Sequence, residues 1–261
     1  IVDKAFHIAN SGRPGPVVIS LPEDIDRSST AQHSVWRSST VGIPSPSTKG
    51  VAKAVSMIEN AERSCIVAGE GVLRVDATDK LIRFAECLGA PVFTAWRRFD
   101  AFPNNHPLYM GGLNLSSVSN DLSEPLKTAD LIIAIGARLD EFTTLSYSSP
   151  STVQKLIHID QSPEETGGSW IGADLAFVAD VGEAMDKLEE ALKNSKRVKP
   201  SKERQNQIAD WSEYFTKRTT PRGNRIGLKD GTIDLEAIYH DILNILTDDA
   251  SITCDAGDFG S

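Results

Sequence analysis

The 261-residue sequence has 40% hydrophobic and 24% charged residues, which is the composition of a folded protein with a buried core rather than of a disordered chain. Its formal net charge of -9 argues against a protein whose main task is to neutralise nucleic-acid phosphates, although helix N-termini can still bind an anionic cofactor. Cys65, Cys87 and Cys254 lie far apart without C-x-x-C spacing, so we expect free thiols and a cytoplasmic location. No apolar run has membrane-spanning length and no basic leader opens the chain, so we expect no membrane partner.

The first fifty residues predict the end of one domain followed by a linker. Ile1 to Asn10 has helical spacing, Ser11 to Pro16 is typical of a turn, and Val17 to Ile19 is an apolar run that favours a strand. Pro22 to Gly50 is rich in Ser, Thr and Pro and has little periodicity. We therefore expect residues 1–27 to be the remnant of a domain, residues 28–47 to be a linker, and both ends of the sequence to be cut within larger domains.

Strand-like and helix-like segments then alternate. The short apolar runs that predict buried strands are Cys65 to Ala68, Pro91 to Thr94, Leu131 to Ile135, Leu156 to Ile159 and Phe177 to Ala179. The segments with helical spacing are Val51 to Asn60, Ala77 to Leu88, Val118 to Thr128 and Gly182 to Lys193. This alternation predicts an α/β fold, a doubly wound parallel sheet of the Rossmann-like kind, over residues 48–197, with ligands at the carboxyl ends of the strands.

Beyond the central unit the composition becomes basic, and we expect a linker over residues 198–230 with a helix from Lys202 to Arg218. A nucleic-acid patch is the alternative for this stretch, but aromatic residues are not interleaved with the basic ones. A helix from Thr232 to Leu246 and a strand from Ser251 to Cys254 predict that residues 231–261 begin a third unit.

The first strand of the central unit leads into Gly69-Glu70-Gly71, where a doubly wound fold receives a phosphate or nucleotide. The dinucleotide fingerprint would need a further glycine where Arg74 stands and an acidic residue where Ala95-Trp96 follow the second strand. An ordinary NAD dehydrogenase is therefore disfavoured. A single G-x-G leaves two interpretations open, a ligand-binding turn and a tight structural turn.

Gly136-Ala137-Arg138-Leu139-Asp140 follows another predicted strand at the same edge. Arg138 can reach a phosphate and Asp140 a hydroxyl group, or the two side chains can form an ion pair that closes the loop. Asp160 and Asp180 end the next two strands, and Asp180 can instead cap the following helix. The five histidines have no metal-ligand spacing, and no G-x-S-x-G, P-loop or H-E-x-x-H motif occurs, so hydrolase and kinase functions are disfavoured.

Together these motifs resemble the thiamine-diphosphate enzyme superfamily, in its acetolactate synthase-like branch. Ser11 to Val18, followed by Leu21-Pro22-Glu23-Asp24, is similar to the last strand of the pyrimidine-binding domain. Gly136 to Asp140 is similar to the G-x-R-x-D loop of the central domain, and Ile157-His158-Ile159-Asp160 to its next strand. Val178-Ala179-Asp180-Val181 resembles the family's G-D-V step, and Ile252 to Gly257 the opening of the diphosphate-binding domain.

The resemblance implies that the central domain holds FAD without redox use, ADP, or no nucleotide. The adenine-nucleotide candidates that it implies are Arg13, Gly71, Ala95, Trp96, Gly112, Leu113, Gly136, Ala137, Arg138, Leu139, Asp140, Asp160, Gln161, Asp180 and Val181. Gly257 and Asp258 would touch the edge of the thiamine diphosphate.

The resemblance also implies a reaction on a 2-oxo acid, decarboxylation or carboligation, with thiamine diphosphate and Mg²⁺ in a pocket between two chains of a homodimer or homotetramer. The activating Glu would precede Ile1 and the G-D-G…N magnesium motif would follow Ser261. We therefore expect no catalytic residue and no metal ligand in this chain, and no turnover by it alone. The alternatives are a nucleotide-binding or purely structural, oligomerising platform, and a sirtuin-like or dehydrogenase use of NAD.

Overall fold

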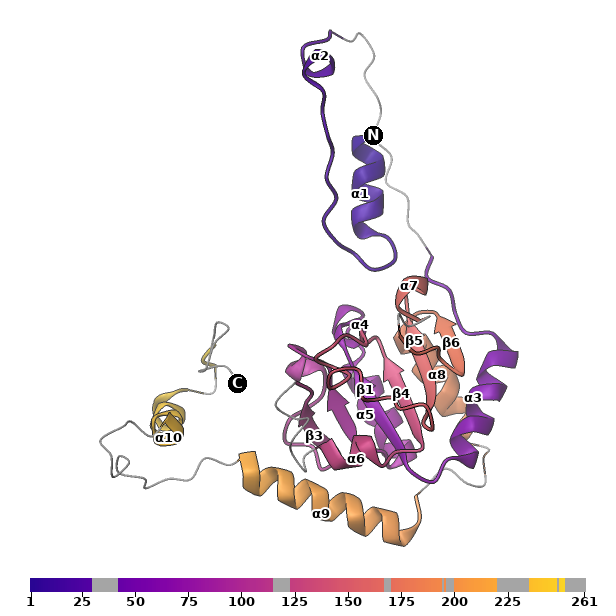
Figure 1. Ribbon diagram of the computed structural model, residues 1–261, viewed down its shortest axis with the longest axis vertical. Helices are drawn as coiled ribbons and strands as arrows, with labels where there is room; N and C mark the ends of the chain where they lie inside the picture. Colours follow the sequence, from indigo (N-terminus) through magenta and orange to yellow (C-terminus); the bar gives the residue numbers. More distant parts are fainter. Residues whose placement is uncertain are drawn as a thin grey trace.

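The computed structural model describes residues 1–29, 42–114, 123–166, 170–193, 195, 200–219, 235–247 and 249–251 (Figure 1). The strands are β1 (Ser64–Ala68), β2 (Val92–Thr94), β3 (Tyr109–Gly112), β4 (Leu131–Ile135), β5 (Lys155–Asp160) and β6 (Leu175–Val178). The helices of the central unit are α3 (Thr48–Asn60), α4 (Glu70–Arg74), α5 (Thr78–Leu88), η1 (Phe99–Ala101), α6 (Glu124–Lys127), α7 (Pro163–Thr166) and α8 (Val181–Leu192). The flanking helices are α1 (Val2–Asn10), α2 (Glu23–Asp26), α9 (Lys202–Thr219) and α10 (Leu235–Ile245).

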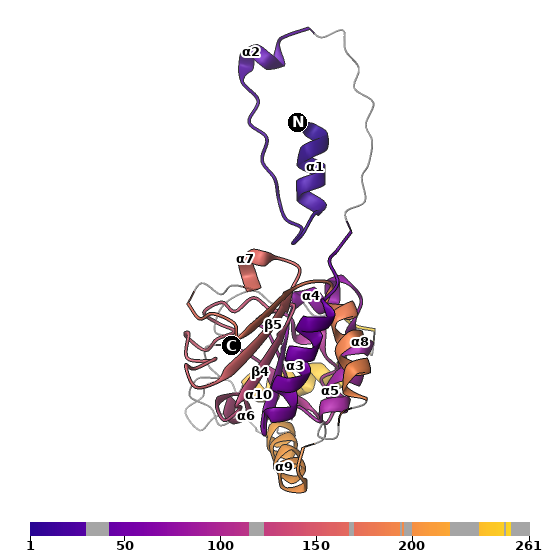
Figure 2. The same cartoon turned by 90° about the vertical axis from the view of Figure 1, so that its right-hand side faces the viewer.

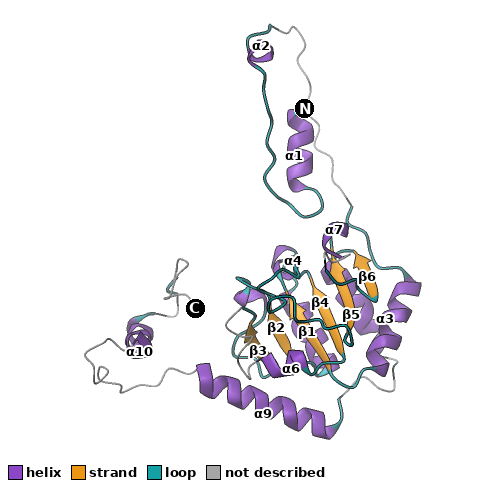
Figure 3. Cartoon of the chain, viewed as in Figure 1, coloured by secondary structure: helices purple, strands orange, loops and turns teal. Residues whose placement is uncertain are grey.

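The six strands form one sheet in the order β3-β2-β1-β4-β5-β6, and every pair of neighbours is parallel (Figure 3). The chain begins in the middle with β1, proceeds outward to β3, and then returns to the other side of β1 as β4. The direction of winding therefore reverses between β1 and β4, which is the place where open parallel sheets bind ligands. The α/β doubly wound fold predicted from the sequence is confirmed.

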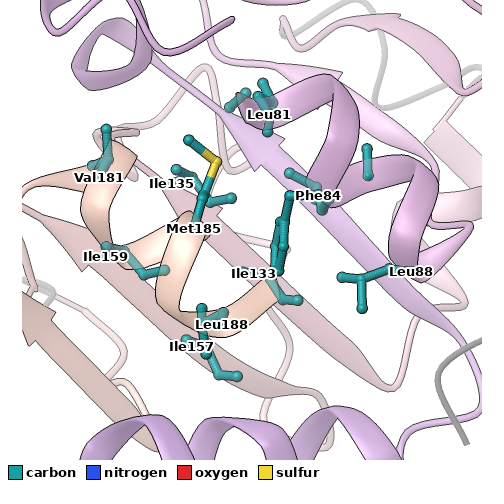
Figure 4. Close-up of a cluster of buried hydrophobic side chains, with 14 of the residues drawn as sticks. Leu81, Phe84, Leu88, Ile133, Ile135, Ile157, Ile159, Val181, Met185 and Leu188 are labelled. Carbon is teal, nitrogen blue, oxygen red and sulfur yellow. The ribbon is translucent and has the colours of Figure 1, made fainter. Parts of the chain in front are cut away.

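Side chains of successive strand residues enter two separate hydrophobic layers. On β4, Ile133 and Ile135 face the layer covered by α3, α5 and α8, and Ile132 and Ala134 face the opposite layer. Figure 4 shows α5 and α8 packed over β4 and β5 in the first layer. In Figure 2 the helices α3, α5 and α8 lie together on one side of the sheet. Because both faces are buried, the strands are almost continuously apolar, which explains why they are visible in the sequence.

The helix α8 illustrates how local sequence positions this layer. Asp180 caps its first turn by accepting a hydrogen bond from the backbone N of Glu183 at 2.9 Å. Val181, Met185 and Leu188 then recur at helical spacing and are at most 1% exposed. The same apolar stripe that predicts the helix therefore attaches it to the sheet.

Two elements differ from the sequence-based predictions. The strand β3 (Tyr109–Gly112) was not predicted, because its four residues include two glycines and form no apolar run. The strand predicted at Val17 to Ile19 is wrong for this structure, in which these residues are extended but not in a sheet, and Val18 is 92% exposed. A strand needs a partner for its backbone hydrogen bonds, and none of the described strands lies beside it. Of the predicted helix from Val118 to Thr128, residues 118–122 lie outside the described residues and the rest contains the short helix α6. Most of the predicted strand from Ser251 to Cys254 also lies outside the described residues.

The helix α9 belongs to the stretch predicted as a linker, yet it packs against the second hydrophobic layer. Ile208 is 6% exposed within that layer, and Trp211 is partly buried against it. By contrast, α1 has no buried residue. No helix among the described residues has both the length and the apolar character to cross a membrane. The domain boundaries stay predictions.

Candidate functional site

The loops that follow β1 and β4 meet at the carboxyl edge of the sheet, where the winding reverses. The backbone N of Gly71 donates to the carbonyl oxygen of Gly136 at 2.9 Å. A Cβ atom on Gly71 would lie 2.6 Å from Gly136 Cα, and Gly136 has a positive φ of 58°. Both glycines are therefore required by the close approach of two protein backbones. Of the two interpretations of Gly69-Glu70-Gly71, this packing favours the tight structural turn.

A cavity of about 120 Å³ opens beside this backbone contact. The residues that line it are Arg13, Glu70, Ala95, Trp96, Arg98, Arg138, Asp140 and Thr143. Five of them were expected from the sequence, from three separate segments of the chain: Arg13, Ala95, Trp96, Arg138 and Asp140. Glu70, Arg98 and Thr143 were missed.

Glu70 lies at the centre of an arginine cluster in this cavity. Its carboxylate accepts hydrogen bonds from Arg74 Nη2 at 2.8 Å and Arg98 Nη2 at 3.0 Å, and Arg13 Nη2 lies 4.0 Å away. Partial burial raises the pKa of the Glu70 carboxyl, but the hydrogen bonds and charges of Arg98 and Arg74 outweigh it, so its pKa is lowered. Glu70 therefore stays ionised while it orients these cations.

Glu165 plays a similar part for Arg138 and for Arg13, which thus lies between the two carboxylates. Its Oε1 accepts from Arg138 Nε at 2.9 Å, and Arg138 Nη2 lies 2.8 Å from the same oxygen. This hydrogen bond and ion pair raise the pKa of Arg138. Arg13 Nη1 lies 3.3 Å from Glu165 Oε1 without the geometry of a hydrogen bond, and this buried nitrogen has no other partner among the described residues. A buried N–H group of this kind is suited to an anionic acceptor.

The loops after β2 and β4 together build an aromatic wall beside the cations. Trp96 stacks on Phe142, with ring centroids 5.0 Å apart and an interplanar angle of 14°. The backbone N of Trp96 donates to Thr143 Oγ1 at 3.3 Å, and Asp140 Oδ1 accepts from the backbone N of Thr143 at 2.8 Å. The ion pair considered between Arg138 and Asp140 is therefore replaced by separate partners for each residue.

The remaining expected residues serve the fold next to the cavity rather than lining it. Ala137, Leu139, Leu113 and Val181 are buried in the hydrophobic layers, with exposures of at most 9%. The carbonyl of Ala137 also contacts His158 Nε2 at 2.9 Å. Burial lowers the pKa of His158, which favours the neutral ring. Because the Ala137 carbonyl can only accept, Nε2 of this ring carries the proton and donates it.

Asp160 and Gly112 are also engaged by neighbouring protein atoms. Asp160 Oδ1 accepts from the backbone N of Ser162 at 2.8 Å, and a Cβ on Gly112 would lie 2.1 Å from Phe99 Cε1. Asp180 is the helix cap described above. Gln161 Nε2 is buried and has no hydrogen-bond partner among the described residues. The two remaining predicted positions, Gly257 and Asp258, lie outside the described residues.

The chemistry available at this edge is recognition of an anion. Arginine presents a planar fork of donors that matches phosphate, and here its orientation is fixed by Glu70 and Glu165. A volume of about 120 Å³ accommodates a phosphate-sized group but is smaller than the roughly 300 Å³ of a typical ligand pocket. An adjoining hollow of about 510 Å³ shares Glu70 and Arg98 with it and adds Arg74 and Arg97. Among the described residues, no group of three or more His, Cys, Asp or Glu side chains is arranged to hold a metal ion.

Comparison with known proteins places this geometry in a family. The family model described as thiamine pyrophosphate enzyme, central domain, matches residues 51–188. Acetolactate synthase large subunits are similar: that of Buchnera aphidicola subsp. Schizaphis graminum is 29% identical over 87% of this chain and 40% of its own length, and that of Corynebacterium glutamicum is 31% identical over 84% and 35%. The glyoxylate carboligase of Escherichia coli O157:H7 is 31% identical over 85% of this chain and 37% of its own length.

A solved structure from Mycobacterium smegmatis, described as a thiamin diphosphate-dependent enzyme, gives a TM-score of 0.58 at 26% identity. The match covers 77% of this chain and 38% of that one. The chain thus spans 35 to 40% of the length of the relatives named above. The family match covers more than half of the chain and coincides with the six-stranded sheet. The chain therefore belongs to the thiamine pyrophosphate enzyme family, and residues 51–188 correspond to the central domain of that family.

Proposed function

We propose that this chain is part of an enzyme that uses thiamine diphosphate and Mg²⁺ to decarboxylate a 2-oxo acid or to join the resulting fragment to a second carbonyl compound. The supporting observation is the family match over residues 51–188, together with similarity to acetolactate synthases and a glyoxylate carboligase. Bound thiamine diphosphate would supply the nucleophilic carbon that attacks the 2-oxo acid. The chain's own candidates for contact with the diphosphate, Gly257 and Asp258, lie outside the described residues, so no step is assigned to a described side chain.

The 261 residues are proposed to supply the central domain and not the catalytic groups. The test is release of CO₂ from pyruvate and from glyoxylate, with thiamine diphosphate and Mg²⁺ added, by this chain and by a longer protein that includes the neighbouring sequence on both sides. We expect turnover only by the longer protein. Turnover by the 261-residue chain would contradict the absence of catalytic residues, and inactivity of the longer protein on every 2-oxo acid tried would contradict the proposed reaction.

We also propose that the carboxyl-edge cavity binds the phosphate part of an adenine nucleotide, either FAD or ADP. Arg13, Arg98 and Arg138 would hold the phosphate oxygens, and the Arg13 nitrogen without a hydrogen-bond partner would gain one. The wall formed by Trp96 and Phe142 would lie beside a ring system. The alternative is a structural platform in which the arginines only pair with Glu70 and Glu165.

Flavin absorbance and the melting temperature distinguish FAD binding, ADP binding and a structural platform. A yellow protein with flavin absorbance after purification would favour FAD, and a colourless protein that ADP stabilises would favour ADP. Adenosine, which lacks the phosphates, should raise the melting temperature much less than ADP, because the arginines have no anion to bind. Equal melting temperatures with ADP, FAD, adenosine and buffer would support the structural platform.

The assembly is also a proposal. We infer a homodimer or homotetramer, as the resemblance to thiamine-diphosphate enzymes implies. Light scattering of the longer protein should give a mass at least twice that of one chain, whereas a monomer would contradict this inference. We also propose a cytoplasmic location, consistent with Cys65 being a free thiol, and its test is fractionation of cells that express the longer protein.

A further inference from the structure

The hollow of about 510 Å³ that adjoins the carboxyl-edge cavity has a lining that is almost entirely charged. Its lining residues are Glu70, Leu73, Arg74, Arg97, Arg98 and Asp100. They come from α4 and from the loop after β2, which includes η1. Figure 3 shows α4 at the end of the sheet where α7 also lies. Because Glu70 and Arg98 line both spaces, the hollow and the cavity lie side by side.

Arg97 differs from the other arginines that line these two spaces. Each of the others forms an ion pair with Glu70 or Glu165, and they are Arg13, Arg74, Arg98 and Arg138. Within the described part of the chain, the exposed Arg97 side chain forms no ion pair or hydrogen bond. Its guanidinium lies over the ring of Trp96, with Cζ 5.7 Å from the centroid. Arg97 is therefore the cation of this edge that has no carboxylate partner among the described residues.

The backbone of Arg97 has a conformation that residues with a side chain rarely adopt. Its φ is 61°, in the left-handed region. The residues on either side hold this turn, because Arg98 Nη1 donates to the carbonyl oxygen of Arg97 at 2.7 Å and the backbone N of Trp96 donates to Thr143 Oγ1 at 3.3 Å. Backbone strain of this kind persists only where the surroundings impose it, and it is concentrated at ligand sites. The turn thus fixes the position of Arg97 beside the cavity.

The charges that line the hollow favour an anion. Three guanidinium groups stand against two carboxylates, which leaves one positive charge in excess. The Glu70 carboxylate is already engaged, by Arg74 Nη2 at 2.8 Å and by Arg98 Nη2 at 3.0 Å. Asp100 is exposed and is the other group of the lining that would repel an anion. Removing the charge of Arg97 and removing that of Asp100 should therefore have opposite effects on anion binding.

We propose that the hollow is a subsite for a terminal phosphate group, read by Arg97, so that the ligand of this edge is a nucleoside diphosphate or triphosphate rather than FAD. This inference rests on the proposed nucleotide site. The cavity of about 120 Å³ accommodates one phosphate group, and the next group of the phosphate chain would enter the hollow. A terminal phosphate has a second ionisable oxygen that the diphosphate of a dinucleotide lacks. Only Leu73 of the lining is apolar, whereas pockets for ring systems are mostly apolar and aromatic.

Calorimetric titration of the 261-residue protein with AMP, ADP, ATP and FAD, without divalent cations, tests the subsite. We expect ADP and ATP to bind about tenfold more tightly than AMP or FAD, because AMP has one phosphate for two spaces and FAD has no terminal phosphate. Equal affinities for AMP, ADP and ATP would overturn the subsite and leave the proposed nucleotide site intact, and so would tighter binding of FAD than of ADP. Binding of none of the four would contradict the nucleotide site itself and this inference with it.

Arg97→Gly tests the role of the side chain without straining the fold, because glycine adopts a positive φ at no steric cost. This variant should melt no lower than the unchanged protein. We expect it to bind ADP about tenfold more weakly and to bind AMP within about twofold of the unchanged protein. An unchanged affinity for ADP, or an equal loss for AMP and ADP, would overturn the role of Arg97 in reading the terminal phosphate.

Two further variants separate a local effect of charge from a general one. Arg63→Gln is the matched control, because it removes a partly exposed arginine that lines neither space. It should bind ADP like the unchanged protein, so a loss equal to that of Arg97→Gly would mean a general charge effect and would overturn the proposal. Asp100→Asn should bind ADP more tightly, because a repelling charge is removed from the hollow. Weaker or unchanged binding of ADP by Asp100→Asn would contradict a phosphate group in the hollow.

Discussion

The N-terminal segment, residues 1–29, and the central unit both contain amphipathic helices, but only the second buries them. In α5, Phe84 is fully buried against the sheet, whereas Phe6 of α1 is 61% exposed. The segment is tied to the central unit through polar contacts of Arg13 with Glu165 and of Arg74 with the carbonyl of Pro14. Helical periodicity therefore predicts where a helix forms, and burial determines how much that helix contributes to stability.

Truncating the same residue type in both regions should give the largest contrast. Phe84→Ala removes a buried ring and leaves a cavity, so we expect a loss of about 3 to 5 kcal/mol in the free energy of unfolding. Phe6→Ala should change it by less than about 0.5 kcal/mol. Urea unfolding of both variants measures the two values. Similar losses would mean that α1 is packed as tightly as α5.

Glycine substitutions test the backbone contact at the carboxyl edge. Gly136→Ala places a Cβ 2.5 Å from Gly71 Cα at a positive φ, so we expect a loss of about 2 to 3 kcal/mol from strain and displaced backbone. Gly15→Ala in the N-terminal segment, where a Cβ meets nothing within 4 Å, is the control and should be nearly neutral. Thermal unfolding of the two variants makes the comparison. A neutral Gly136→Ala would show that the two loops can separate.

Helix capping should give the next largest contrast between the N-terminal segment and the central unit. The helix α8 has the Asp180 side chain as its cap, whereas α1 begins after Ile1 without a side-chain cap. Asp180→Ala should lower the free energy of unfolding by about 1 kcal/mol, and Asp180→Asn should retain most of it. If Asp180→Asn kept the stability but weakened ADP binding, Asp180 would contact the nucleotide, as the family resemblance implies.

Acid should weaken the ion pairs of Glu70 with Arg74 and Arg98 inside the central unit, with the smallest effect. The lowered pKa of Glu70 means that its contribution is fully present above about pH 4.5, the ordinary value of a Glu, and is lost as the pH falls through the lowered value. Because the side chain is 35% exposed, solvent screening limits this contribution to less than about 1 kcal/mol. The melting temperature, measured at pH values from 7 to 3, should fall less steeply with decreasing pH for Glu70→Gln than for the unchanged protein. Identical slopes would contradict a role for the Glu70 charge.

The sequence identifies the buried strands because burial on both faces requires continuous apolar residues. Leu131 to Ile135 is predicted and observed with the same bounds. By contrast, β3 contains Gly111 and Gly112 and becomes a strand through pairing with β2, which no local pattern reveals. Val17 to Ile19 has a strand-like pattern without a described partner. Periodicity thus reports burial and not the identity of the neighbouring strand.

The cavity is predicted less completely, for a related reason. Arg138 is recognisable because it follows a buried strand, and Arg13 is recognisable through the family motif. Glu165 is not, since its ion pair with Arg13 joins positions 152 residues apart (165 minus 13) and only the fold brings them together. Glu70 was noticed only as the middle of a glycine turn. Its role as the common acceptor of several arginines depends on side-chain directions that the spacing does not encode.

The central proposal is that the arginine cluster at the carboxyl edge of the central domain binds an anion. Calorimetric titration of ADP into the unchanged protein, Arg138→Gln and Lys155→Gln tests it directly. Both variants remove one exposed cation with a single carboxylate partner. Lys155 begins β5 and pairs with Asp174, and neither of these residues lines the cavity. We expect one ADP per chain for the unchanged protein and for Lys155→Gln, and at least tenfold weaker binding by Arg138→Gln. Equal affinities for all three proteins, or no binding of ADP by any of them, would contradict the account.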